Sequence, residues 1–189
     1  MKKLIIFAVI TIALFVFPGC DGEEILEYVF DETVVRAETG DSTIGGASTK
    51  LLDKAPERIH NIKLAIEKIN ETVVRPNEEF SFNDTVGERS EERGFKKATA
   101  LFGREKVQEF GGGVCQVSTT IFQAAKQAGL EIEERHQHKR EIPYAKLGQD
   151  ATVDFDARFD LRIKNNTDSS IKIIVSSDEE HVHVTLDKM

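Results

Sequence analysis

The sequence predicts an α+β fold, a single domain with a mainly antiparallel sheet and two main helices. Two segments, residues 56–70 and 114–128, carry apolar residues at helical spacing. After Gly129 the pattern changes to short alternating stretches separated by turn residues, which is typical of antiparallel strands. The roughly 130 residues involved are enough for one core but not for two.

The first twenty residues have the layout of a lipoprotein signal peptide, which we assign to residues 1–19. Lys2 and Lys3 precede an apolar run, residues 4–17, that is too short to span a bilayer and leads into Pro18-Gly19-Cys20. A small residue before Cys is where lipoprotein signal peptidases cut, so Cys20 is the expected lipidation site. We therefore expect an exported protein, anchored by its N-terminal lipid in the outer face of the cytoplasmic membrane.

Residues 20–54 predict a lipid-anchored flexible tether. The segment is acidic, contains Gly-rich and Ser/Thr-rich patches between residues 40 and 49, and shows no sustained period. The globular domain is therefore expected at residues 55–189.

The first expected helix is 56–70, with Pro56 suited to its first turn. Short extended pieces at 73–74 and 80–82 follow. Residues 97–102 and 106–110 are predicted to pair as a hairpin around Gly103, leading into Gly111-Gly112-Gly113-Val114-Cys115, the turn that opens the second helix. The later expected strands share alternation of apolar and polar residues. They are residues 130–136, 152–155, 161–164, 171–175 and 182–186.

The composition argues against some classes of function. The chain has 189 residues and a formal charge of −8, and loss of Lys2 and Lys3 with the signal would make it more acidic, so nucleic acid is not expected as a partner. It has no Trp and only two Tyr, which disfavours a lectin-like module. Of its two cysteines, lipidation would occupy Cys20, which leaves Cys115 as a lone thiol in an oxidising compartment.

Cys115, His138 and Asp150 occur in an order that suits a catalytic triad. A helix N-terminus favours thiolate, a His can take the thiol proton, and a carboxylate can orient the imidazole. His136 remains an alternative base, because both His residues lie on one face if that segment is extended. A Cys on an amphipathic helix is otherwise a small buried hydrophobe, and the sequence leaves both interpretations open.

Five neighbours of Cys115 are candidate substrate-binding residues. The glycines permit close approach of a substrate to the backbone, and the others add polar groups. They are Gly112, Gly113, Gln116, Ser118 and Thr119.

Three blocks of sequence together resemble the VanW family, over a region from about residue 56 to nearly the C-terminus. They are residues 80–83, residues 111–120 and residues 148–153, joined by Asp160-Leu161 and Lys164-Asn165-Asn166. The resemblance implies a VanW-like domain at residues 55–189, a bacterial cell-envelope setting and a link to vancomycin resistance. A looser similarity, with Cys on a helix start followed by His and Asp, is to transglutaminase-like and papain-like thiol enzymes.

Three functions follow from these observations, and no cofactor is expected. The first is a Cys-His-Asp thiol hydrolase or transferase acting on peptide or amide bonds of the cell wall. The second is a non-catalytic module that binds peptidoglycan or a cell-surface protein. A metal site at His136 and His138 or at His181 and His183 ranks last, because no spacing matches a zinc signature.

Overall fold

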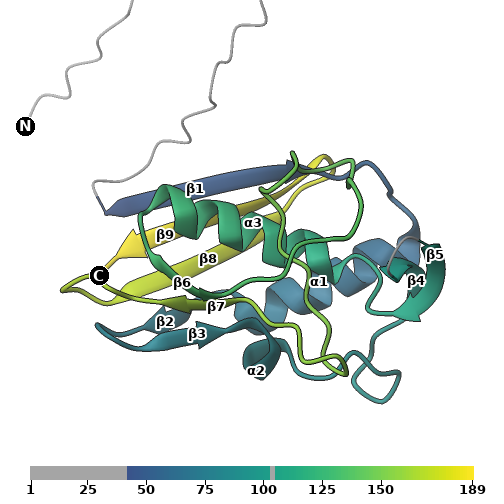
Figure 1. Cartoon of the computed structure of the whole chain (residues 1–189), viewed down its shortest axis with the longest axis horizontal. Helices are drawn as coiled ribbons and strands as arrows, with labels where there is room; N and C mark the ends of the chain where they lie inside the picture. Colours follow the sequence, from purple (N-terminus) through teal and green to yellow (C-terminus); the bar gives the residue numbers. More distant parts are fainter. Residues whose placement is uncertain (1–41, 103–104) are drawn as a thin grey trace, which may run out of the picture. The chain divides into compact units, whose positions relative to one another are not determined.

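The computed structural model describes residues 42–102 and 105–189, which contain three helices and nine strands (Figure 1). The predicted signal peptide, Cys20 and most of the predicted tether lie outside these residues. Every strand pairing is antiparallel, but the strands form three separate sheets of four, three and two strands. The predicted α+β class is confirmed. No helix within the described residues is long and apolar enough to cross a bilayer.

The largest sheet has the order β1-β9-β8-β2 and carries one side of the core. Its strands are β1 (Thr43–Lys50), β9 (His181–Lys188), β8 (Ile171–Ser177) and β2 (Thr72–Val74). Alternate residues of β8 and β9 are buried, as expected for a sheet with one covered face. Helix α3 (Val114–Gln127) packs on β1 and β9, and α1 (Pro56–Ile69) packs on β8. Both predicted main helices are confirmed.

Strand β1 corrects the predicted tether, since residues 43–50 belong to the main sheet rather than to a flexible segment. The glycines that gave this segment the composition of a linker have a packing role. A Cβ on Gly45 would lie 2.6 Å from the carbonyl oxygen of Ala124 and 2.7 Å from the Cβ of Ala128. Gly45 therefore lets β1 lie directly against α3.

The second sheet, with the order β3-β7-β6, is organised around a buried carboxylate. Its strands are β3 (Glu79–Ser81), β7 (Arg162–Lys164) and β6 (Glu131–Glu134). Asp160 accepts hydrogen bonds from Ser81 Oγ at 2.5 Å and from the backbone N–H of Asn83 at 2.8 Å. Ser81 also caps the short helix α2 (Phe82–Val86), which was not predicted from the sequence.

The third sheet is the predicted hairpin, β4 (Lys97–Phe102) paired with β5 (Glu105–Phe110). The expected strand at 152–155 is not formed. That segment makes only isolated bridges, between Thr152 and His136 and between Asp154 and Phe159. Instead of joining a sheet, residues 150–153 pack along α3, where they help to build the site described next.

Candidate functional site

The predicted nucleophile, Cys115, is the second residue of α3 and is partly buried. The helix begins after Gly113, which has a φ of 108°. Glycine adopts this left-handed backbone conformation readily, whereas other residues adopt it only with strain. The backbone N–H groups of Val114 and Gln116 donate to Gly111 and Gly113. Over the described residues, the N–H of Cys115 itself has no acceptor. The first turn of the helix therefore offers one free donor beside the thiol.

The three glycines before α3 are enclosed by protein, each by a different neighbour. A Cβ on Gly112 would lie 2.4 Å from the carbonyl oxygen of Ala98, and one on Gly113 would lie 2.8 Å from Cγ of Arg58. A Cβ on Gly111 would lie 2.6 Å from Cγ of Arg89. The absence of side chains thus serves the packing of the turn. The predicted contact of Gly112 and Gly113 with substrate stays a prediction.

His138 and Asp150 lie together on the segment that crosses the start of α3. The Nδ1 of His138 is 2.7 Å from Oδ2 of Asp150, which also accepts the backbone N–H of His138 at 2.7 Å. The other carboxylate oxygen accepts from Arg135 at 3.1 Å. Both side chains of the His–Asp pair are buried, with 6% and 4% of their area exposed. Asp150 therefore fixes the position of the imidazole.

Cys115 interacts with the same imidazole, and the effect is visible in the pKa values of both groups. Burial alone raises the pKa of Cys115, but the hydrogen bond and charge of His138 outweigh it, so the thiol pKa lies below its ordinary value. Burial alone lowers the pKa of His138, but the interactions with Cys115 and then with Asp150 outweigh burial, so the imidazole pKa lies above its ordinary value. Both shifts are in the direction that stabilises the charged forms, a thiolate next to an imidazolium, relative to the isolated groups.

The sulfur has two further neighbours on the segment 150–153. The Sγ lies 3.4 Å from the carbonyl oxygen of Val153, to which a neutral thiol can donate, and 3.7 Å from Oγ1 of Thr152. The hydroxyl can donate to a thiolate, whereas the carbonyl cannot. Deprotonation of Cys115 therefore replaces the hydrogen bond to the carbonyl of Val153 by one from the hydroxyl of Thr152.

His136 occupies a different environment from His138. Its Nε2 lies 2.7 Å from a carboxylate oxygen of Glu134, and its ring stacks on Phe159 with the centroids 4.3 Å apart. Of the two candidate bases that the sequence left open, it is His138 whose pKa and that of Cys115 affect one another.

The predicted polar neighbours Gln116, Ser118 and Thr119 are almost completely buried and have protein partners. Gln116 donates to the carbonyl of Lys50 at 2.9 Å and accepts from Arg58 at 3.1 Å. The hydroxyl of Ser118 donates to the carbonyl of Ala151 at 2.7 Å, and Thr119 accepts the N–H of Ala151 at 3.1 Å. These bonds give the three side chains a structural role, and their contact with substrate stays a prediction.

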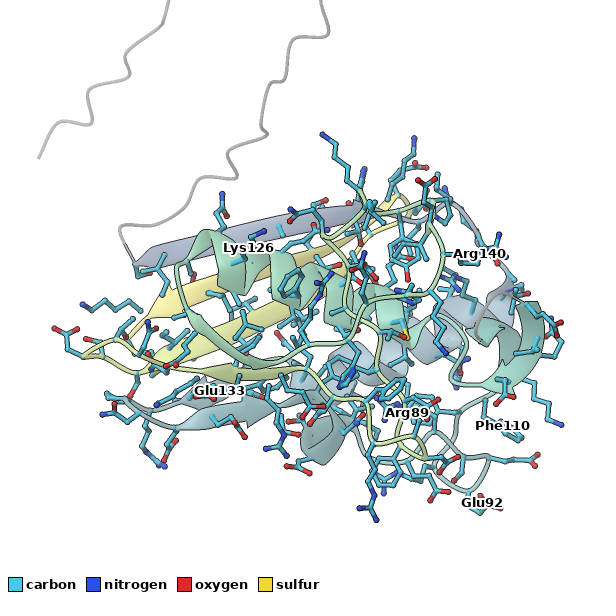
Figure 2. All side chains as sticks on the ribbon, in the orientation of Figure 1. Arg89, Glu92, Phe110, Lys126, Glu133 and Arg140 are labelled. Atoms are coloured by element: carbon cyan, nitrogen blue, oxygen red, sulfur yellow. The ribbon has the colours of Figure 1, made fainter. Side chains whose placement is uncertain are left out.

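Two arginines border the glycine turn and were not recognised from the sequence. Nη1 of Arg89 donates to Asn83 and Gly87, and Nη2 is buried without a partner; Arg58 likewise has a buried, unpartnered Nε. Within the described residues neither forms an ion pair with a carboxylate. Burial lowers the pKa of Arg89, against the effect of nearby negative groups, Cys115 first among them. Figure 2 labels Arg89.

Tyr144 is the other residue that sequence reasoning missed. Burial raises the pKa of its phenol, and a negative charge on Cys115 raises it further, while Arg58 acts in the opposite direction. The phenol also forms a hydrogen bond with Thr119 on α3. Arg58, Arg89 and Tyr144 stand far from Cys115 in the sequence, and no local pattern indicated them.

The histidines considered for a metal site lie in two places. His136 and His138 have different partners, as described above. His181, His183 and Asp178 have ligand atoms within 4.8 Å of one another at the β8–β9 turn, although Nε2 of His183 is already 2.9 Å from Asp178. Asp178 of this group is exposed and the two histidines are partly buried, and the group is separate from Cys115 in the fold.

Comparison with known proteins identifies the family. A family model described as VanW like protein matches residues 57–186. The uncharacterized protein YoaR of Bacillus subtilis is 44% identical over 116 residues, covering 61% of this chain and 38% of that protein. The vancomycin B-type resistance protein VanW of Enterococcus faecalis is 29% identical over 130 residues, covering 66% of this chain and 47% of that protein. No solved structure matches the chain.

The described residues thus define an α+β domain with a Cys–His–Asp cluster at the start of its central helix. The chain belongs to the VanW family, because the family match covers more than half of its length. It spans less than half the length of either of these two curated relatives.

Proposed function

We propose that the domain is a thiol-dependent acyl-transfer enzyme, which cleaves a peptide or amide bond in cell-wall material and passes the acyl group to water or to an amine. The observation that carries the proposal is the buried hydrogen bond between His138 and Asp150, together with the opposite pKa shifts that His138 and Cys115 cause in one another. A structural cysteine needs no such partner, whereas a nucleophile needs a base and the base needs an orienting group.

The proposed reaction has two steps. The Cys115 thiolate attacks the carbonyl carbon and forms a C–S bond, while the C–N bond breaks and His138 gives its proton to the departing amine. Water or a second amine then attacks the thioester, His138 takes the proton of the attacking group, and the C–S bond breaks to return the thiolate. Asp150 holds the imidazole in one orientation through both steps.

The charges around Cys115 support this chemistry. The free N–H of Cys115 is a donor for the oxyanion that forms in each step. Arg58 and Arg89 add two cations that no carboxylate of the described residues neutralises at ion-pairing distance. Positive potential in a partly buried site favours thiolate and oxyanion alike.

We further propose that the domain works in the cell envelope, as a lipoprotein held in the membrane by Cys20. The signal-like sequence before Cys20 supports export, and the name of the Enterococcus relative concerns vancomycin resistance. Peptidoglycan is accordingly the substrate we expect.

The proposal is tested by the pH dependence of Cys115 alkylation with iodoacetamide, in a Cys20→Ala background that leaves one thiol. We expect an alkylation pKa below the value of about 8.5 for a free thiol, and a rise toward that value in His138→Ala. His136→Ala is the matched control and should leave the alkylation pKa unchanged, because His136 bonds to Glu134.

An unreactive thiol in all three proteins would contradict the proposal. Cys115 would then be a structural residue, held by the carbonyl of Val153, and the domain would be better explained as a non-catalytic module that binds peptidoglycan or a surface protein.

A further inference from the structure

A polar depression of about 460 Å³ lies between β1, α3 and residues 144–149. Its floor and walls include Gly46 and Ser48 of β1, Gln123 and Gln127 of α3, and Tyr144 and Gln149 of the crossing segment. No Asp or Glu lines it, and Lys146 is its one charged residue. The depression therefore suits a ligand that is polar but does not need a carboxylate partner.

One wall of this depression is the edge of the main sheet. Strand β1 pairs only with β9 among the described strands, so its other edge is open. The direction of each backbone group follows from three hydrogen bonds. Leu51 donates to Glu180 across the sheet, while Gly46 donates outward to Gln127 and Lys50 accepts outward from Gln116. Because directions alternate in an antiparallel strand, the N–H and C=O of Ser48 point outward too.

Ser48 is the residue whose outward groups remain unused. The neighbouring outward N–H of Gly46 is taken by Gln127 at 2.6 Å, and the outward carbonyl of Lys50 is taken by Gln116 at 2.9 Å. Ser48 is exposed, and neither its N–H nor its C=O has a partner in the described part of the chain. One residue of an extended peptide placed opposite Ser48 would exchange two backbone hydrogen bonds with it.

The same edge contacts the residue that follows the proposed nucleophile. Gln116, which bonds to Lys50 at the end of β1, directly follows Cys115 in the sequence. Tyr144 lies at the boundary, because it lines the depression and also interacts with Thr119 and Cys115. Lys50 is two residues beyond Ser48, a distance of about 7 Å along a strand. A short peptide bound at Ser48 can thus extend toward Cys115.

We propose that the open edge of β1 at Ser48 binds the acyl-donor substrate as an extended peptide, through its main chain, and directs it past Tyr144 to Cys115. The cleavage of the bound peptide rests on the proposed function, whereas its binding is argued from the geometry of β1 alone. The glutamine side chains of α3 bond to β1 and to the crossing segment rather than to carboxylates, which agrees with recognition of neutral backbone groups.

The test is fluorescence anisotropy of a dye-labelled tetra-alanine peptide with the purified full chain in detergent. Ser48→Pro removes an outward N–H together with the hydroxyl, on an edge strand where proline is tolerated, and should weaken binding about fivefold. Ser48→Ala keeps the N–H and should bind within about twofold of wild type. A tetra-alanine N-methylated at alternate residues should bind the unmodified protein less tightly by a similar factor, which tests the idea even if Ser48→Pro does not fold.

The link to Cys115 is tested with the chloromethyl ketone of the same peptide, in which the thiolate displaces chloride. We expect alkylation of Cys115, located by mass spectrometry, to be faster than with iodoacetamide in wild type, and this advantage to be lost in Ser48→Pro. Saturable peptide binding with a thiol inert to both reagents would refute the enzyme proposal but not the binding site. Absence of saturable binding, or equal binding by the N-methylated peptide, would overturn the inference, as would dimerisation of the chain through β1 that Ser48→Pro abolishes.

Discussion

Gly112→Ala should be among the most destabilising small substitutions in the domain. The added Cβ would lie 2.4 Å from the carbonyl oxygen of Ala98, 2.6 Å from its carbonyl carbon and 2.9 Å from the carbonyl oxygen of Thr99. All three neighbours are backbone atoms of β4, which is paired along its length with β5. They cannot rotate away as the end of a side chain would.

The cost follows from these contacts. Overpacking in a rigid environment costs about 1–3 kcal/mol. Movement of Thr99 would also lengthen the bond that its carbonyl accepts from Arg58 at 3.3 Å, a further loss of about 1 kcal/mol. We therefore expect the free energy of unfolding to fall by about 3 kcal/mol.

The assay is equilibrium urea denaturation followed by circular dichroism, with Gly129→Ala as the matched control. Gly129 has a φ of 71° but nothing within 4 Å of its added Cβ, so that substitution should cost only the backbone strain, about 1 kcal/mol. If Gly112→Ala cost no more than Gly129→Ala, the turn would be loosely packed, and the glycines would require another explanation, such as approach of a substrate.

Three further results are expected. In Cys115→Ala the pKa of His138, measured by NMR, should fall, because its interactions with Cys115 raise that pKa. A raised folded-state pKa stabilises the fold at pH values below the unfolded pKa of about 6.5, and this gain is lost as the pH rises through the folded-state pKa. The stabilisation that His138 provides at acid pH should therefore also be smaller in Cys115→Ala. Cys20→Ala should move the protein from the membrane fraction to the soluble fraction, whereas a protein that stays with the membrane would exclude a lipid on Cys20 as its anchor. Ser81→Ala should lower the free energy of unfolding by about 1–3 kcal/mol in urea, because Asp160 is buried and loses a partner at 2.5 Å, and an unchanged midpoint would mean that another group replaces the hydroxyl.

The elements predicted from the sequence are those whose pattern reflects burial on one face. Helix α1, predicted at residues 56–70, runs from Pro56 to Ile69, and α3, predicted at 114–128, runs from Val114 to Gln127. Strands β8 and β9 alternate between buried and partly buried residues over most of their length, and both were expected. In such segments the local period and the tertiary burial carry the same information.

Strand β1 and the segment 150–153 were misjudged for a physical reason. The glycines of β1 reduce its apolar pattern, but they are required because α3 lies against the strand at Gly45. Residues 150–153 resemble a strand in composition, yet they bond to side chains of α3, including Ser118 and Thr119. A close approach to a helix cannot be read from the residues of one segment.

The candidate site was predictable only in part, because some of its residues carry no local signal in the sequence. Cys115, His138 and Asp150 were named from their order and residue types; the fold joins His138 to Asp150 by a hydrogen bond, and His138 lowers the pKa of Cys115. Arg58 and Arg89 had no distinguishing signal, because an arginine without a carboxylate partner looks like any other arginine in a sequence. Their significance comes from burial against the glycine turn that precedes Cys115, which only the tertiary structure reveals.

The residues around Cys115 differ in role, some serving the fold and others the proposed reaction. This difference decides what membership of the VanW family implies about chemistry. Within the block of residues 111–120, the glycines are enclosed by protein, and the buried polar side chains bond to β1 and to the segment 150–153. A resemblance in this block therefore argues first for a shared fold, because the scaffold alone requires those residues. Evidence for shared chemistry must come from His138 and Asp150 themselves, because the Asp150 side chain bonds to His138 and Arg135 rather than to the buried polar side chains of α3. Relatives that keep the glycine turn but lack either residue would be expected to fold in the same way and to have an ordinary thiol, and their alkylation pKa would separate the scaffold from the reaction.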